Sequence, residues 1–400
     1  MTTKKQTSAL ADQRDRDLIT SALDDTLIVE AAAGTGKTTE LVHRMVRVIE
    51  TGRAEVTEIV GVTFTEKAAG ELKLRLRETL EAARQAAAPA SKKRNRLDNA
   101  LRRLEEAQIS TIHGFCADLL GERPVEAQVD PLFTVLTEAQ ARRMYNTSFQ
   151  HWLQEQLADP PEGVQRSLRR PVFAGFQPGS GTHEAPIERL RNAGWELSQW
   201  RDFHAGWQRP PFDREDRIDA LVERLHRFAD QSASPTSRYD HLFVDTRSVR
   251  RLSEDIHRTE RVTQRDYTRL ESLLIELGQN QDFKRARKGR GEHYGRGISR
   301  TDVWQMRDAL QTELGEFEAD ANADLAALLR DELRTCEERY DNAKTRAGAL
   351  DFLDLLLKAR NLVKNDDGVR RSFQQRYKHL FVDNHLRSAY AARPAGVASF

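Results

Sequence analysis

Short apolar runs alternate with amphipathic stretches in the first third of the chain. Residues 27–29 are a leucine, an isoleucine and a valine in succession, and they predict a short buried strand. Residues 59–64 and 109–112 predict two further strands, and each of the three runs is followed by apolar residues at helical spacing. Strand–helix units in series favour a parallel sheet with right-handed crossover connections. We therefore expect an α/β domain here.

A long helical stretch interrupts this pattern. Residues 141–345 consist mainly of charged segments with helical periodicity, separated by proline-rich breaks. The strand–helix pattern then resumes and leads to a further apolar strand over 379–383. We therefore expect one sheet domain formed by residues 1–140 and 346–383, interrupted by the helical insertion and followed by a divergent tail over 384–400.

Composition limits the possibilities further. Of the 400 residues, 38% are hydrophobic and 31% are charged. No run of about 18 apolar residues is present, which excludes a membrane-spanning helix and fits a cytoplasmic protein. Cys116 and Cys336 are the only cysteines and lie far apart in the sequence, so neither a disulfide framework nor a zinc site has its ligands. The net charge of +1 gives no overall attraction to nucleic acid, so any such binding must come from local patches.

One local patch stands out within the helical stretch. The segment FKRARKGRGEHYGRGISR, 283–300, holds seven arginines and lysines against the single Glu292. Two interpretations stay open for it. It is either a mobile solvated loop or a loop that grips phosphate groups.

The clearest chemical motif follows the first predicted strand. The residues of this loop are Ala31, Ala32, Ala33, Gly34, Thr35, Gly36, Lys37 and Thr38. A strand, a loop of small residues and a helix form the context in which a P-loop cradles phosphates with its backbone N–H groups. Lys37 would reach the β- and γ-phosphates, and the Thr38 hydroxyl would bind Mg²⁺. We therefore expect ATP and Mg²⁺ as cofactors. The alternative is a glycine-rich turn that caps an ordinary helix.

The pentapeptide HLFVD occurs twice, at 241–245 and at 379–383. An apolar strand that ends in an aspartate is a common way to hold Mg²⁺ near a P-loop. Asp383 ends the strand that follows the resumed strand–helix pattern, so it is the predicted Mg²⁺ ligand. Asp245 lies inside the helical insertion, and we interpret its copy as a surface coincidence.

Five blocks in this order resemble the UvrD/RecB group of superfamily 1 DNA helicases, and most closely its RecB-like and AddA-like exonuclease subunits. The blocks are VEAAAGTGKT, VTFTEKAAGELKLRL, ISTIHGFCADLL, LDFLDLL and YKHLFVD. The resemblance implies a RecA-like P-loop domain, with the helical insertion in the place of the 1B subdomain. It also implies ATP hydrolysis coupled to DNA unwinding in recombination and double-strand-break repair. The implied partners are single- or double-stranded DNA and a helicase or nuclease subunit.

The resemblance also assigns roles to residues outside the P-loop. Gln13 would read the adenine edge, unless it is an ordinary polar residue of a first helix. The residues that would contact single-stranded DNA are Thr63, Phe64, Thr65 and Lys67 in one block and Ser110, Thr111 and His113 in the next. Phe64 has an alternative role in closing the core at the end of its strand, and His113 has one as a structural histidine.

The sequence leaves the family pattern directly after Asp383. The family has a glutamate at the next position, where this chain has Asn384, and an asparagine cannot accept a proton from the attacking water. Loss of a general base typically costs about 10²–10⁴ in rate. Motifs III to VI have no counterpart either, so we expect an N-terminal, truncated portion with impaired hydrolysis, whose tail arose by frameshift or premature termination. The alternatives are a non-catalytic nucleotide- or DNA-binding module that docks on a helicase partner, and a different P-loop ATPase.

Overall fold

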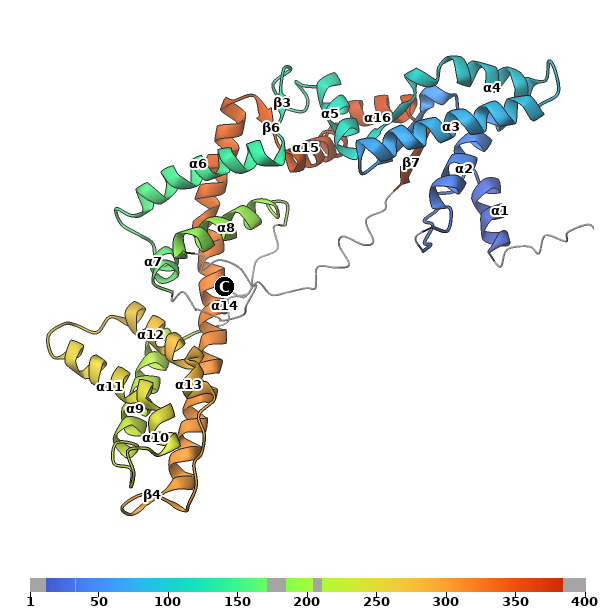
Figure 1. Cartoon of the computed structure of the whole chain (residues 1–400). Helices are drawn as coiled ribbons and strands as arrows, with labels where there is room; N and C mark the ends of the chain where they lie inside the picture. Colours follow the sequence, from blue (N-terminus) through green and yellow to red (C-terminus); the bar gives the residue numbers. More distant parts are fainter. Residues whose placement is uncertain (1–11, 33, 171–184, 204–210, 384–400) are drawn as a thin grey trace, which may run out of the picture. The chain divides into compact units, whose positions relative to one another are not determined.

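The computed structural model describes residues 12–32, 34–170, 185–203 and 211–383. The predictions for Ala33 and for the tail over 384–400 therefore lie outside the described residues. The chain divides into two compact units (Figure 1). Among the described residues, a sheet unit comprises 12–138 with 348–383, and a helical unit comprises 139–347.

A parallel sheet in the order β2–β1–β7 forms the centre of the sheet unit. Its strands are β1 (Ile59–Thr63), β2 (Gln108–Thr111) and β7 (His379–Asp383). Thr63 is paired in register with Thr111 on one side and with Asp383 on the other. Because the carboxyl ends of parallel strands meet at one edge, these three residues form a row there. The predicted strands at 59–64, 109–112 and 379–383 are thus confirmed to within one residue.

Helices pack around this sheet in two apolar cores. The first core joins α2, α3 and α4 to the sheet, with Met45 and Leu72 fully buried and Gly61 of β1 closely packed against both. The second core joins α5, α15 and α16. The helices of this unit are α1 (Gln13–Ser21), α2 (Lys37–Thr51), α3 (Glu66–Ala86), α4 (Lys92–Arg102), α5 (Ile112–Glu122), α15 (Phe352–Asn365) and α16 (Asp367–Arg376), with short 3₁₀ turns at Val56–Glu58 and Leu104–Glu106. A two-residue parallel pair, β3 (Thr134–Val135) and β6 (Ala349–Leu350), completes it.

The predicted buried strand at 27–29 is wrong. Residues 26–32 have no regular secondary structure, and Ile28 is 91% exposed. A strand of three residues is stable only when a neighbour pairs with its backbone groups. Among the described residues, β7 is the last strand on its side of the sheet, and no strand lies beside 27–29. The apolar run at 27–29 was therefore not sufficient to form a strand without a pairing partner.

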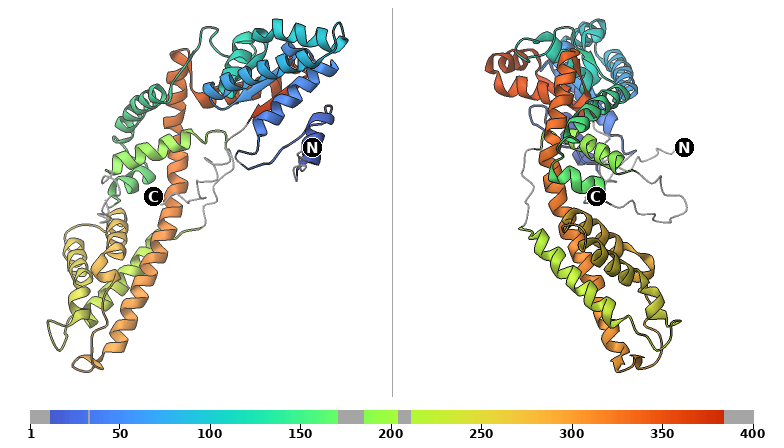
Figure 2. Two further views of the ribbon diagram at one scale, coloured as in Figure 1. Left: turned by 45° about the vertical axis from the view of Figure 1, so that its right-hand side comes forward. Right: turned by 90° about the vertical axis from the view of Figure 1, so that its left-hand side faces the viewer.

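The helical unit is organised along one helix of 47 residues, α14 (Arg300–Arg346) (Figure 2). The helices α7, α8, α9 and α12 all contact α14. The other elements are α6 (Glu138–Gln156), α7 (Glu162–Arg169), α8 (Pro186–Ser198), α9 (Arg214–Gln231), α10 (His241–Asp245), α11 (Arg247–Glu260), α12 (Tyr267–Gln279), α13 (Gln281–Lys284) and the hairpin β4 (His293–Gly295) and β5 (Ile298–Ser299). No helix among the described residues is long and apolar enough to cross a membrane.

Two apolar cores follow one another along α14, and a buried layer of charges lies between them. One core comes from helices between residues 218 and 321, and the other from α6, α7, α8 and the later part of α14. Arg166 is fully buried in the layer, where it is paired with Asp324 at 2.6 Å and with Glu271 at 3.0 Å. Because each of these buried charges has an opposite partner, the layer avoids the large cost of an unpaired ion.

Candidate nucleotide site and DNA-facing edge

The loop before α2 has the backbone geometry of a phosphate cradle. Gly34 and Gly36 have φ values of +79° and +90°, in the left-handed region that favours glycine. Gly36 is the N-cap of α2, and no side chain of the described residues caps the N–H groups of the first helical turn. These N–H groups and the positive end of the helix dipole are therefore suited to bind an anion.

Lys37 lies folded against this loop. Its Nζ donates to the carbonyl oxygens of Ala31 at 2.7 Å and Ala32 at 3.1 Å, and the Thr35 hydroxyl donates to Ala32 at 2.8 Å. The ammonium group is thus held by neutral carbonyl oxygens close to the loop backbone. A phosphate oxygen would be a stronger partner for it, because its negative charge attracts the ammonium, whereas a carbonyl oxygen is neutral.

Thr38 and Asp383 meet although they lie 345 positions apart in the sequence. The Thr38 hydroxyl donates to the Asp383 carboxylate at 2.7 Å, and Asp383 is 6% exposed at the end of β7. Neighbouring ligand oxygens of octahedral Mg²⁺ lie about 3 Å apart, because each Mg–O distance is about 2.1 Å. A hydroxyl and a carboxylate at this separation fit two adjacent corners of a Mg²⁺ shell.

Helix α1 carries Gln13 and Arg16, and of these two Arg16 is the one with a described contact to the phosphate loop. The Gln13 amide donates to Asp17 at 2.9 Å and is exposed, so its role at the adenine edge stays a prediction. Arg16, one turn later, donates to the Thr35 carbonyl oxygen at 2.9 Å and is paired with Glu40 at 2.7 Å. Arg16 was not among the predicted site residues. Its spacing of three from Gln13 was the available signal, because it places both residues on one face of the helix.

The polar residues predicted to touch DNA lie together at the carboxyl edge of the sheet. Several of their hydroxyl groups form hydrogen bonds to other residues of the same edge. Thr63 donates to the Thr65 carbonyl oxygen at 3.0 Å, Thr65 caps α3, and Thr111 caps α5 while it donates to Glu66 at 3.0 Å. Ser110 is half-buried beside Thr111, and Lys67 is exposed in the first turn of α3. The threonines therefore shape the edge, and Lys67 supplies its accessible charge.

Aromatic rings cluster at the same edge. Phe64, directly after β1, is 47% exposed, so it does not close the core. Its ring lies 6.5 Å from that of His113, and His113 lies 4.9 Å from Phe352 in the first turn of α15. Phe352 is 44% exposed. Burial lowers the pKa of His113, which favours a neutral ring at pH 7. Phe352 was not among the predicted site residues.

Asp245 takes no part in this site. Its pentapeptide forms helix α10 in the helical unit, and the carboxylate accepts from the backbone N–H of Arg287 and from its Nε, both at 3.0 Å. The side chain of Asp245 is only 13% exposed. The surface coincidence that we inferred is therefore partly wrong. This first copy lies in the helical unit, and its aspartate anchors the basic segment.

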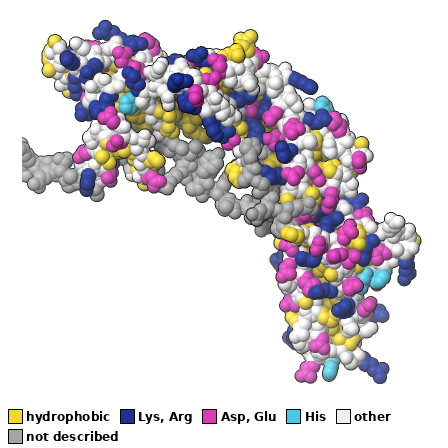
Figure 3. All heavy atoms as spheres, turned by 180° about the vertical axis from the view of Figure 1, so that it is seen from behind, with side chains coloured by type: hydrophobic (Ala, Val, Ile, Leu, Met, Phe, Trp, Pro, Cys, Tyr) yellow, Lys and Arg dark blue, Asp and Glu magenta, His cyan; other side chains and the backbone are white. Residues whose placement is uncertain are grey.

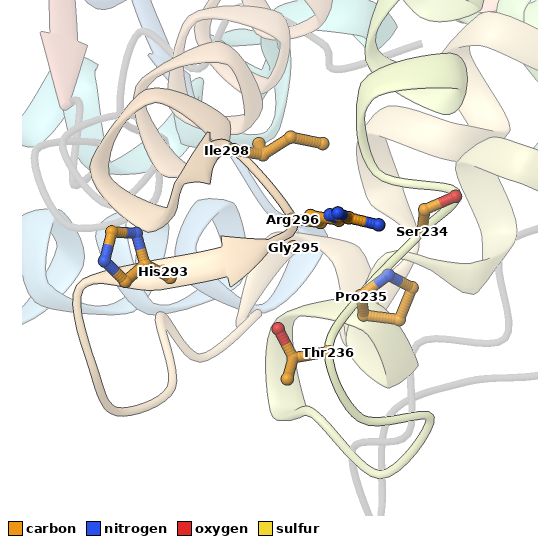
Figure 4. A pocket seen from close by; sticks show the side chains of 8 residues that line it. Ser234, Pro235, Thr236, His293, Gly295, Arg296 and Ile298 are labelled. Atoms are coloured by element: carbon orange, nitrogen blue, oxygen red, sulfur yellow. The ribbon is translucent and has the colours of Figure 1, made fainter.

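The basic segment over 283–300 is held by its last residue, the buried Arg300. Arg300 is paired with Asp240 at 2.7 Å and donates to the carbonyl oxygens of Lys288 and Gly291. Arg296 and His293 line an open pocket together with residues 234–236 (Figure 4). Basic and acidic side chains are interspersed on the molecular face in Figure 3, as the net charge of +1 would suggest. The remaining cations of the segment are exposed: Lys284, Arg285, Lys288, Arg290 and Arg296.

Comparison with known proteins gives a consistent result. The family described as the UvrD/REP helicase N-terminal domain matches residues 11–385. A protein of Listeria welshimeri that is named as an ATP-dependent helicase/nuclease subunit is 25% identical over 404 aligned residues, which cover 90% of this chain and 31% of the relative. Proteins of the same name from Limosilactobacillus reuteri and Desulforudis audaxviator are 34% and 37% identical, over 53% and 32% of this chain and 13% and 10% of their own lengths. The chain thus spans about a third or less of the length of these relatives.

Proposed function

Because the chain belongs to the UvrD/REP helicase N-terminal domain family, we propose that it is the ATP-binding part of a DNA helicase of the RecB/AddA type. The contact between Thr38 and Asp383 carries this proposal. It joins the P-loop to the end of β7 at 2.7 Å and provides two hard oxygen ligands. Mg²⁺ held there would neutralise the charge of the β- and γ-phosphates.

In this proposal each part of the nucleotide is bound by different residues of the chain. The N–H groups of residues 34–38 bind the β-phosphate, and Lys37 exchanges its two carbonyl partners for phosphate oxygens. Ala31 and Ala32 form the first part of the loop, and Gln13 faces the adenine. The RecA-like identity of the sheet unit and the 1B-like identity of the helical unit belong to the same proposal.

Substitution of Lys37 tests the nucleotide site. Lys37→Ala should abolish ATP binding measured by calorimetry, because the variant loses the only side-chain ammonium that contacts the loop among the described residues. Lys92→Ala removes an exposed lysine of α4 and should bind ATP as the wild type does. Equal affinities for the wild type and Lys37→Ala would refute the P-loop assignment.

The same edge of the sheet suits single-stranded DNA. Phe64, His113 and Phe352 provide ring faces for bases, and Lys67 provides a charge for the backbone. Stacking of one base on an aromatic ring is worth about 1–3 kcal/mol. Phe352→Ala should therefore weaken binding of an oligothymidine at least about fivefold in fluorescence anisotropy. Tyr239→Ala, which removes a 91% exposed ring in the helical unit, is the matched control. An equal loss of DNA affinity in both variants would mean that Phe352 is not a specific contact for the DNA.

Asn384 favours a second candidate function, a non-catalytic module that holds nucleotide or DNA beside a helicase partner. An asparagine cannot act as the general base for water. Under this alternative, ATP turnover stays at background when single-stranded DNA is added. DNA-stimulated turnover would instead favour an active ATPase.

A further inference from the structure

One arginine connects the helix that carries Gln13 to the phosphate loop. All three guanidinium nitrogens of Arg16 donate hydrogen bonds. Nη1 contacts Glu40 at 2.7 Å, Nη2 contacts the Thr35 carbonyl oxygen at 2.9 Å, and Nε and Nη2 contact Asp12 at 3.1 and 2.8 Å. The guanidinium is therefore fixed from α1, from α2 and from the loop together.

The contact with Thr35 sets the direction of one peptide group. A trans peptide is planar, and its C=O and N–H point in opposite directions. When Arg16 holds the Thr35 carbonyl, the N–H of Gly36 must point away from Arg16. Thr35 lies between Gly34 and Gly36, both at positive φ, where a peptide can flip at little steric cost. An external contact is thus needed to keep one orientation.

We propose that Arg16 is a positioning residue for nucleotide binding, which keeps the Gly36 N–H turned toward the β-phosphate. The inference rests on the proposed function. Gly36 suits this position because its φ of +90° is in the left-handed region, and the site of a Cβ there would lie in ordinary contact with the Arg16 guanidinium, 3.7 Å from Nη1. Glu40, in the first turn of α2, holds the guanidinium from the other side.

Arg44 offers a closely matched control. Its Nη1 donates to the Ile19 carbonyl oxygen at 2.6 Å, and its Nη2 donates to that of Asp25 at 2.8 Å. Arg44 thus connects α2 to α1 and to the segment that follows α1 by two hydrogen bonds to carbonyl oxygens, both shorter than the 2.9 Å bond from Arg16 to Thr35. Neither of these bonds involves the P-loop. A general loosening of α1 would follow from either substitution, whereas misdirection of the loop would follow only from the loss of Arg16.

The test uses the full chain and ADP. Calorimetry should give an affinity about tenfold weaker for Arg16→Ala than for the wild type, since a charge-assisted contact to the loop is lost. Arg16→Lys should lie between them, because one ammonium cannot bridge three partners. Arg44→Ala should bind ADP as the wild type does. Without nucleotide, the amides of residues 34–38 should exchange hydrogen faster in Arg16→Ala, whereas those of α3 should not.

Two results would overturn the inference. One is an Arg16→Ala affinity equal to that of the wild type, and the other is an equal loss in Arg44→Ala. If the wild type binds ADP and Lys37→Ala does not, either result removes the role of Arg16 alone and leaves the nucleotide site intact. If the wild type fails to bind ADP, the proposed function and this inference fail together.

Discussion

The same five residues, HLFVD, form helix α10 at 241–245 and strand β7 at 379–383. Before the first copy, Asp240 accepts hydrogen bonds from the N–H groups of Leu242 and Phe243 and so begins a helix. Before the second copy, the N–H of Lys378 donates to the Glu58 carbonyl oxygen at 2.8 Å and aligns the chain beside β1. A local cap decides one structure, and pairing with a distant strand decides the other. Intrinsic propensity is a weak guide when tertiary contacts differ in this way.

The two copies also bury different side chains. In the helix Leu242 is fully buried, whereas in the strand its counterpart Leu380 is 61% exposed and Phe381 is buried instead. The alternation of β7 turns Phe381 and Asp383 to the inside and Leu380 and Val382 outward. The carboxylates end in different surroundings as a result. Asp383 meets a threonine of the P-loop, and Asp245 meets an arginine of the basic segment.

The largest expected difference between the two copies is in the stability lost when their leucines are replaced by alanine. Leu242→Ala should lower the free energy of unfolding of the helical unit by about 2–5 kcal/mol, the usual cost of truncating a buried leucine. Leu380→Ala should change that of the sheet unit by no more than about 0.5 kcal/mol, because most of its side chain is already in water. Urea denaturation followed by hydrogen exchange of peptides from each unit measures both. Similar costs for the two variants would contradict the assigned burial.

A smaller effect is expected from the contact between Asp245 and Arg287. Asp245→Asn should destabilise the helical unit by about 1 kcal/mol at pH 7, because the ion pair with Arg287 is lost and one accepting oxygen becomes an amide NH2 group. The hydrogen bond from Arg287 lowers the pKa of Asp245 in the folded state. The stabilisation of the folded state by this contact is therefore fully present above the unfolded pKa of about 3.9, and it is lost as the pH falls through the lower folded pKa. Unfolding measured from pH 7 to 3 should show the wild type and Asp245→Asn converging at the acid end. A constant difference between them would exclude this pair as the cause.

The sequence predicted the parts of the fold whose signals are local and repeated. The strands at 59–63, 108–111 and 379–383 each combine an apolar run with a following or preceding helix, and all three were found. Residues 27–29 have the same apolar character but lack a neighbouring strand among the described residues, which no local pattern reveals. Phe352 and Arg16 were missed for a related reason. The whole helical unit separates Phe352 from His113 in the sequence, so their contact has no local signal. The role of Arg16 depends on its hydrogen bond to the Thr35 carbonyl oxygen, which appears only in the folded chain.

We propose that, of the two HLFVD copies, only the one that ends at Asp383 serves a nucleotide-bound Mg²⁺. The most direct measurement is the affinity of the chain for ATP with and without Mg²⁺, compared among the wild type, Asp383→Asn and Asp245→Asn. We predict that Mg²⁺ strengthens ATP binding in the wild type and in Asp245→Asn, and that this gain disappears in Asp383→Asn, because the carboxylate 2.7 Å from Thr38 is then neutral. A full Mg²⁺ effect in Asp383→Asn, or its loss in Asp245→Asn, would contradict the account.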